Sequence, residues 1–285
     1  MRLIFKRMLP AGIAAALFLA AAAPALAQDA QVLMPEQSAA KAKDLIQGVI
    51  QALGGSAYLN VKDVSCDGRA AQFGHSGALN DYDSFYEFTK LPDKDRTEFS
   101  KKRNIIQIFS GNQGWILDRG GVTEAPPDAI ADNQRELELD LDHILRNRLN
   151  EPGMIFRYDG PDTVDLQEAE WVELNDSEGR EIRIAIAKLT HLPIRKEVAM
   201  RDPKTHMRAE EVDYYSNYHS VDGVVIPFQV THIRDGLKVY QIFYQTCKFN
   251  DGLTDSLFTK ESLDERWAKV GKKEKKSKKD EKSKP

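Results

Sequence analysis

Short runs of alternating apolar and polar residues fill most of the chain between residues 61 and 249. In one of them, Ile182, Ile184 and Ile186 lie on one side and Arg183 on the other. A period of two is typical of antiparallel strands with one buried face. The runs predict strands at roughly 61–74, 82–89, 94–100, 104–110, 114–118, 154–158, 182–186, 194–200, 212–218, 224–234 and 238–249.

Two stretches, 39–53 and 128–150, follow the helical spacing of three to four instead. The first ends at Gly54 and Gly55, as a helix C-terminus should. In the second, the acidic residues lie opposite the apolar ones, and Arg146 and Arg148 stand near the C-terminal end. Both stretches predict amphipathic helices whose apolar side needs a partner surface.

The predicted fold class is mainly β, a single strongly curved antiparallel sheet with a helical cover. No helical crossovers separate the strands, which excludes parallel α/β folds. About 10–11 strands exceed what a flat sheet tolerates without curling. We therefore expect a half-open β-barrel whose concave apolar face is covered by an N-terminal helix and by a central helix at about 128–150.

The first 27 residues have the pattern of an export signal. Arg2, Lys6 and Arg7 precede a short apolar run, and Ala25 and Ala27 supply small residues before a cut at Gln28. We expect a cleaved signal peptide at 1–27 and a soluble protein in the bacterial periplasm. The remaining expected parts are a flexible leader at 28–38, one domain at 39–260 and a Lys-rich disordered tail at 261–285.

Charge is unevenly distributed along the chain. The net charge is −4, and loss of the three basic signal residues takes it to −7. Residues 272–285 carry a net charge of +5, which leaves −12 for residues 28–271. Such an acidic domain argues against nucleic-acid binding. The basic tail has two interpretations, a solubilising segment or an attachment to the anionic envelope surface.

Two cysteines, Cys66 and Cys247, fall in the first and last predicted strands. Export to an oxidising compartment permits a disulfide between them. Two separately buried thiols remain the alternative, because sequence does not place their Cα atoms within bonding distance.

A set of short motifs appears in a fixed order along residues 39–260. They are Leu53-Gly54-Gly55, the segment 91–96 (LPDKDR), the segment 109–115 (FSGNQGW), the segment 144–147 (ILRN), the segment 218–227 (YHSVDGVVIP), Asn250-Asp251-Gly252 and Leu257-Phe258. In this order and spacing the chain resembles the LolA-like superfamily of periplasmic outer-membrane lipoprotein-sorting proteins, which includes LolB-like and RseB-like relatives.

This resemblance implies a half-open barrel whose cavity takes the acyl chains of a lipoprotein, with helices that move to admit them. It also implies a lid held by an Arg directly before the Pro of the third-strand motif. Here that position is Leu91, with Lys90 beside it. The sequence therefore predicts a cover for the concave face but lacks the family's residue for gating it.

Apolar side chains on the strands and the central helix are the candidate ligand contacts. The predicted cavity-lining residues are Phe88, Ile106, Ile108, Trp115, Leu141, Leu145, Phe156, Ile184, Val198 and Phe228. Each also has an interpretation as an ordinary core residue, and an error of one position in a strand would move it to the other face.

The chain shows no pattern typical of an enzyme. It has no GxSxG motif and no Gly-rich phosphate loop, and its six histidines lack the local spacing of metal ligands. We predict no catalytic residues, no metal and no cofactor.

The predicted function is a non-enzymatic, monomeric periplasmic carrier of an apolar ligand, namely the acyl chains of a lipid or lipoprotein. One alternative is a sensory protein that uses the same fold to bind an envelope membrane protein. Another is a structural envelope protein whose helix never moves.

Overall fold

The computed structural model of the chain describes residues 33–202 and 205–269. Its contacts divide the chain into Met1–Leu33 and Met34–Pro285, and all the elements below belong to the second unit. The predicted signal peptide at 1–27 and the tail from residue 270 onward lie outside the described residues.

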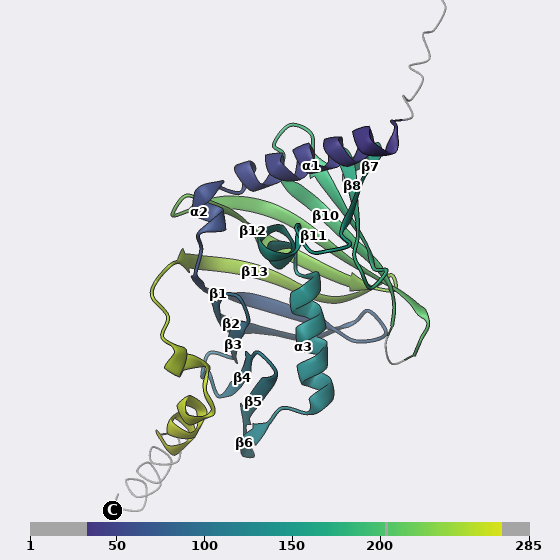
Figure 1. Cartoon of the computed structure of the whole chain (residues 1–285). Helices are drawn as coiled ribbons and strands as arrows, with labels where there is room; N and C mark the ends of the chain where they lie inside the picture. Colours follow the sequence, from purple (N-terminus) through teal and green to yellow (C-terminus); the bar gives the residue numbers. More distant parts are fainter. Residues whose placement is uncertain (1–32, 203–204, 270–285) are drawn as a thin grey trace, which may run out of the picture. The chain divides into compact units, whose positions relative to one another are not determined.

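Thirteen strands form one antiparallel sheet (Figure 1), which confirms the predicted fold class. The strands are β1 (Asp63–Phe73), β2 (Leu79–Lys90), β3 (Lys94–Phe99), β4 (Ile105–Ser110), β5 (Gln113–Asp118), β6 (Gly121–Glu124), β7 (Ile155–Val164), β8 (Gln167–Asn175), β9 (Glu181–Ala187), β10 (Pro193–Arg201), β11 (Arg208–Val221), β12 (Val224–Arg234) and β13 (Leu237–Phe249). The expected number of 10–11 was too low because β6 and β8 were missed. β6 has only four residues, and four glutamyl and glutaminyl side chains interrupt the apolar pattern of β8.

The strand order has one long-range step. It runs β6-β5-β4-β3-β2-β1-β13-β12-β11-β10-β9-β8-β7, so every neighbouring pair except β1 and β13 is consecutive in the chain. β6 and β7 are therefore the two free edges of an open, curved sheet.

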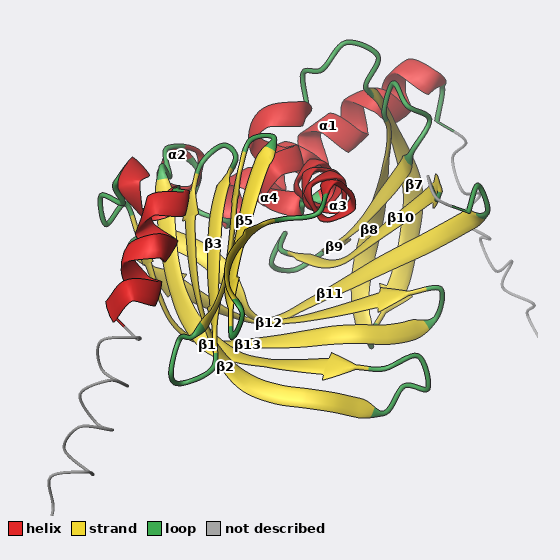
Figure 2. Cartoon of the chain, turned by 90° about the horizontal axis from the view of Figure 1, so that it is seen from below, coloured by secondary structure: helices red, strands yellow, loops and turns green. Residues whose placement is uncertain are grey.

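Helices cover the concave side of this sheet, as Figure 2 shows. They are α1 (Pro35–Ala52), α2 (Ser56–Leu59), α3 (Pro127–Leu139), α4 (Leu141–His143) and the π-helical turn η1 (Ile144–Arg148). The segment from α3 to η1 connects β6 to β7, the two edges of the sheet. This connection crosses the concave side of the sheet, and we call residues 127–148 the lid segment.

Both predicted helices need a correction. α1 begins at Pro35, so residues 35–38 of the expected leader are helical; Pro suits the first helical position, where its missing N–H costs nothing. The central helix is broken at Asp140, whose ψ of 135° is extended. The Asp140 side chain accepts a hydrogen bond from the backbone N–H of His143 and so caps a new helical start.

The C-terminal part of the described chain also differs from expectation. After the short helix η2 (Asp255–Phe258), residues 260–269 are helical, although the disordered tail was expected from residue 261. Leu263 is fully buried with Phe258 against Ile106, Ile108 and Leu117. This segment therefore covers part of the sheet instead of extending from it.

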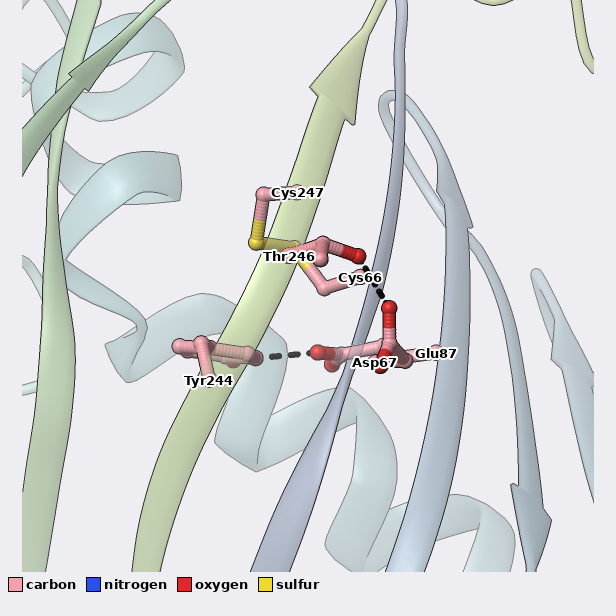
Figure 3. The surroundings of a disulfide bond; sticks show 6 residues. All are labelled: Cys66, Asp67, Glu87, Tyr244, Thr246 and Cys247. Atoms are coloured by element: carbon pink, nitrogen blue, oxygen red, sulfur yellow. Dashed lines mark hydrogen bonds between the residues drawn. A yellow bond between two sulfur atoms is a disulfide. The ribbon is translucent and has the colours of Figure 1, made fainter.

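Cys66 and Cys247 form a disulfide, which decides between the two alternatives left by the sequence. They are directly opposed in the β1–β13 pair, and Figure 3 shows the bond lying across the two strands. Beside it, Tyr244 donates a hydrogen bond to Glu87, and Thr246 donates one to Asp67. The bond thus covalently joins the one pair of neighbouring strands, among those of residues 33–202 and 205–269, that is not consecutive in the chain.

We expect the double variant Cys66→Ser/Cys247→Ser to lose about 2–5 kcal/mol of unfolding free energy, because the bond closes a loop across nearly the whole domain. Urea unfolding of the wild type with and without a reducing agent provides the comparison. The reduced wild type should match the variant, and the variant should not respond to reductant. Equal stability of all four samples would contradict the prediction.

Candidate functional site

The apolar part of the concave face lies on β8, β9 and β10. Ile182, Ile184 and Val198 are fully buried there. Leu141, Ile144 and Leu145 of the lid segment belong to the same core cluster, as does the apolar side of α1. The lid segment therefore fills the sheet's apolar hollow with its own side chains.

Six of the ten predicted lining residues lie in this cluster or pack against it. They are Leu141, Leu145, Ile184, Val198, Phe156 and Phe228. Whether they contact a ligand stays a prediction.

The other four, Phe88, Ile106, Ile108 and Trp115, lie on the opposite face of the sheet. Strand pairing aligns Phe88, Arg96, Ile108 and Trp115 in one row. Arg96 in that row donates to the Leu257 carbonyl and to Ser262 of the C-terminal segment. Their assignment to the concave face is therefore wrong: both faces of this part of the sheet are covered, so apolar character alone does not distinguish them.

Polar contacts hold the lid segment along its flank at β8–β10. Lys196 Nζ donates to the Leu139 carbonyl at 2.6 Å, and Arg180 pairs with Glu138 at 2.7 Å. Arg148, only 4% exposed, donates to the Glu138 carbonyl at 2.6 Å and pairs with Asp176 at 3.1 Å. Lys196 and Arg180 thus hold the break between α3 and α4 to the sheet, and Arg148 of the lid segment itself reaches Asp176 in the β8–β9 turn.

A second group of contacts ties the lid segment to α2. Tyr58 is fully buried and donates to Asp142 at 2.7 Å. Arg146 donates to the Tyr58 carbonyl, and its guanidinium lies 3.9 Å from the centre of the Tyr58 ring. These contacts hold the C-terminal part of the lid segment against α2. In the sequence, Arg146 stood out only for its place near a helix end.

Leu91, at the position of that Arg, packs against the main core. Its neighbour Lys90 pairs with Asp255 in the C-terminal segment at 2.8 Å. Within the described part of the chain, neither side chain makes a polar contact with the lid segment, which is held by other residues.

Under α3 the concave face becomes polar. Asp213 accepts from Lys196 and His232, each at 2.7 Å, and Arg135 of α3 pairs with Glu211 at 3.0 Å. The lysine and histidine hold the pKa of Asp213 well below its ordinary value. α3 thus meets the sheet through ion pairs, with only Leu139 of its own residues buried.

Four carboxyl groups share this polar region, Glu87 and Asp95 on the sheet and Glu136 and Asp140 on the lid segment. Desolvation between lid and sheet raises the pKa of each, and repulsion from nearby carboxylates adds to the effect. The pKa of Asp95 rises to about 7 and that of Asp140 to about 6. Both of these residues of the lid segment, Glu136 and Asp140, keep exposed surface.

The same face contains a cavity near the β1–β2 turn, of about 250 Å³. Its lining residues are Ala70, Gln72, Asp81, Asp83, Phe99, Ser100, Ile105 and Gln107.

Within residues 33–202 and 205–269, no three His, Cys, Asp or Glu side chains are arranged to hold a metal ion. In the same ranges, every helix is too short or too polar to span a bilayer.

The chain matches no protein-family model and no curated protein. Solved structures do share its fold. A DUF1329 family protein from Desulfovibrio piger is 16% identical, covers 78% of this chain and 98% of its own, and gives a TM-score of 0.56. A domain named for outer membrane lipoprotein sorting, from Vibrio parahaemolyticus, is 11% identical, covers 79% and 99%, and gives 0.53. The chain therefore shares the fold of a domain named for lipoprotein sorting, as the resemblance in the sequence implied.

We expect Asp95→Asn to reduce the dependence of stability on pH between 5 and 8. The pKa of Asp95 is raised in the folded state, so folding favours its protonated form. The resulting stabilisation is complete below about pH 4 and is lost as the pH rises through about 7. The wild type should lose about 1–2 kcal/mol more of unfolding free energy over this interval than the variant does.

Urea unfolding at each pH measures the difference. Asp81→Asn, at an exposed position of the neighbouring strand β2, is the control and should follow the wild type. If the unfolding free energy of Asp95→Asn depends on pH as that of the wild type does, the burial of Asp95 has no energetic effect.

Proposed function

We propose that this protein is a non-enzymatic periplasmic carrier that holds the acyl chains of a lipid or lipoprotein between its concave sheet face and the lid segment. The observation that supports this most is the division of contacts around residues 127–148. Their apolar side chains fill the hollow of the sheet, whereas their flanks are held by ion pairs and hydrogen bonds. A ligand chain that replaced Leu141, Ile144 and Leu145 would keep the hollow filled.

The two kinds of contact respond differently when the lid segment moves. The Arg180–Glu138 pair, whose carboxylate is partly exposed, exchanges for hydration at a cost of about 0–1 kcal/mol, whereas the buried Arg148–Asp176 pair costs more to break. Exposing apolar surface is costly unless something apolar replaces it, at about 0.8 kcal/mol for each CH₂. A dozen methylenes in the hollow correspond to about 10 kcal/mol before the costs of association. Opening is therefore unfavourable without a ligand and favourable with one.

The shared fold with a domain named for lipoprotein sorting supports the acyl-chain proposal. Lipid extraction from purified protein, followed by mass spectrometry, tests it. Stoichiometric lipid is expected. Protein without lipid that also fails to bind a fluorescent fatty acid would contradict the proposal and favour the sensory or structural alternatives.

Leu145→Ala should strengthen binding of a fluorescent fatty acid several-fold, because it leaves space for a chain in the hollow. The free protein should lose about 2–5 kcal/mol of stability, and the ligand should restore part of it. The control is Leu117→Ala, which truncates a side chain that is 2% exposed on the opposite face. It should cost similar stability without changing affinity, so equal affinity changes in both variants would refute the location of the site.

Glu138→Gln should increase the rate of fatty-acid uptake several-fold, because it weakens the pairing of the lid segment with Arg180. Stopped-flow fluorescence measures the rate. Glu178 pairs with the same Arg180 at 3.3 Å but lies outside the lid segment. Glu178→Gln is therefore the matched control, and uptake at the wild-type rate in both variants would show that this contact does not limit opening.

A further inference from the structure

Lys196 is a buried cation on the concave face, where the apolar part of that face meets the polar part. The residue is 5% exposed. Strand pairing places it between Ile184 on β9 and Asp213 on β11. Ile184 is fully buried in the main core, whereas Asp213 belongs to the polar region under α3. Lys196 therefore stands at the polar end of the apolar hollow.

Two acceptors bind the ammonium group of Lys196. Nζ donates to Asp213 at 2.7 Å and to the Leu139 carbonyl at 2.6 Å. Desolvation opposes the charge of Lys196, but Asp213 and Asp140 outweigh it and raise the pKa of the group, so the ammonium keeps its charge. Of these neighbours only Asp213 is part of the sheet, because Leu139 and Asp140 belong to the lid segment.

Movement of the lid segment takes the Leu139 carbonyl away from Lys196. Asp213 also binds His232 at 2.7 Å and does not replace the lost acceptor. Water replaces it only while the hollow is open, since an apolar chain packed against Ile184 excludes water beside Nζ. A buried ammonium N–H without an acceptor is costly. A ligand that takes the place of the lid segment therefore has to supply an acceptor of its own.

The closed lid segment shows which chemical group fits this position. Its carbonyl oxygen at Leu139 binds Lys196, and the apolar side chains of Leu141 and Leu145, which follow in the chain, fill the hollow. An acyl group has the same order of parts, a carbonyl oxygen followed by an alkyl chain. An alkane of the same length fills the hollow but leaves Lys196 without its second acceptor.

We propose that Lys196 binds the carbonyl oxygen at the head of the acyl chain, so that the ligand replaces both the Leu139 carbonyl and the apolar side chains of the lid segment. This inference rests on the proposed carrier function and deepens it, because it requires an acyl compound and not merely an apolar one. The oxygen belongs either to an ester of a lipid or lipoprotein or to the carboxylate of a free fatty acid. Both are acceptors for an ammonium group.

Competition binding with ligands of equal length tests the proposal. Methyl dodecanoate and dodecyl methyl ether differ only by a carbonyl group in place of a CH₂ group, and displacement of an uncharged fluorescent dye measures the affinity of each. The wild type should bind the ester at least about tenfold more tightly than the ether. Equal affinities would overturn the proposal and leave the carrier function standing. Dodecanoic acid is the third ligand, and its affinity relative to the ester identifies which of the two acyl sources the protein prefers.

Variants assign the preference for the ester to Lys196. Lys196→Met keeps an unbranched side chain without its donors and should bring the ratio of ester to ether affinity close to one. Lys196→Arg keeps a cation and should retain most of the ratio. An unchanged ratio in Lys196→Met would overturn the proposal. Circular dichroism confirms that each variant is folded.

Arg135→Gln is the matched control. It removes the 3.0 Å ion pair between Arg135 of α3 and Glu211 of the sheet and leaves Lys196 in place. The variant weakens the hold on the lid segment without removing the donor for the ligand. Its affinities for ester and ether should therefore change by the same factor. A loss of the ratio in this variant would show that lid contacts, and not Lys196, set the preference.

Infrared spectroscopy of bound methyl dodecanoate, isotope-labelled at the carbonyl carbon, gives a readout that needs no variant. A hydrogen bond from an ammonium group lowers the carbonyl stretching frequency below its value in an apolar solvent. The ester bound to the wild type should show this shift, and the ester bound to Lys196→Met should not. An unshifted band in the wild type would overturn the proposal. Failure of all three ligands to bind would overturn the carrier function and this inference together.

Discussion

The pairing of β1 with β13 is the contact on which the rest of the structure depends. All other neighbouring strands follow each other in the chain and can form by local hairpins. This pair joins residues near the two ends of the domain and is linked by Cys66 and Cys247. Because it puts β1 and β13 in the middle of the sheet, β6 and β7 become the edges, and the segment between them crosses the concave face.

That crossing segment combines two kinds of interaction with different consequences. Its apolar residues, such as Leu145, fill the hollow of the sheet. Its flank is held by Arg148 and Arg180, which bind carboxylates and a carbonyl. The polar contacts fix where the segment lies, and they can be exchanged for water. The apolar contacts can be exchanged only for something equally apolar. A cover built in this way is stable when closed and selective in what can displace it.

The residues of the site were only partly predictable. Ile184 and Val198 were found because they alternate on strands with one strongly apolar face. Ile106 and Ile108 were assigned to the wrong face because the C-terminal helical segment buries the opposite side of β4 as well. Glu87 and Asp95 gave no signal, since an isolated acidic residue on a strand is usually solvated. Their raised pKa values arise only when α3 lies above them.

Local spacing in the sequence determined the antiparallel strands, the positions of two amphipathic helices and the need to bury their apolar sides. These properties follow from backbone geometry within a few residues. Tertiary structure decided the disulfide, the contact of Tyr58 with the lid segment, the contact of Arg148 with Asp176, and which face of each strand is concave. Each of these joins residues far apart in the chain, and a local pattern does not encode which distant segments will meet.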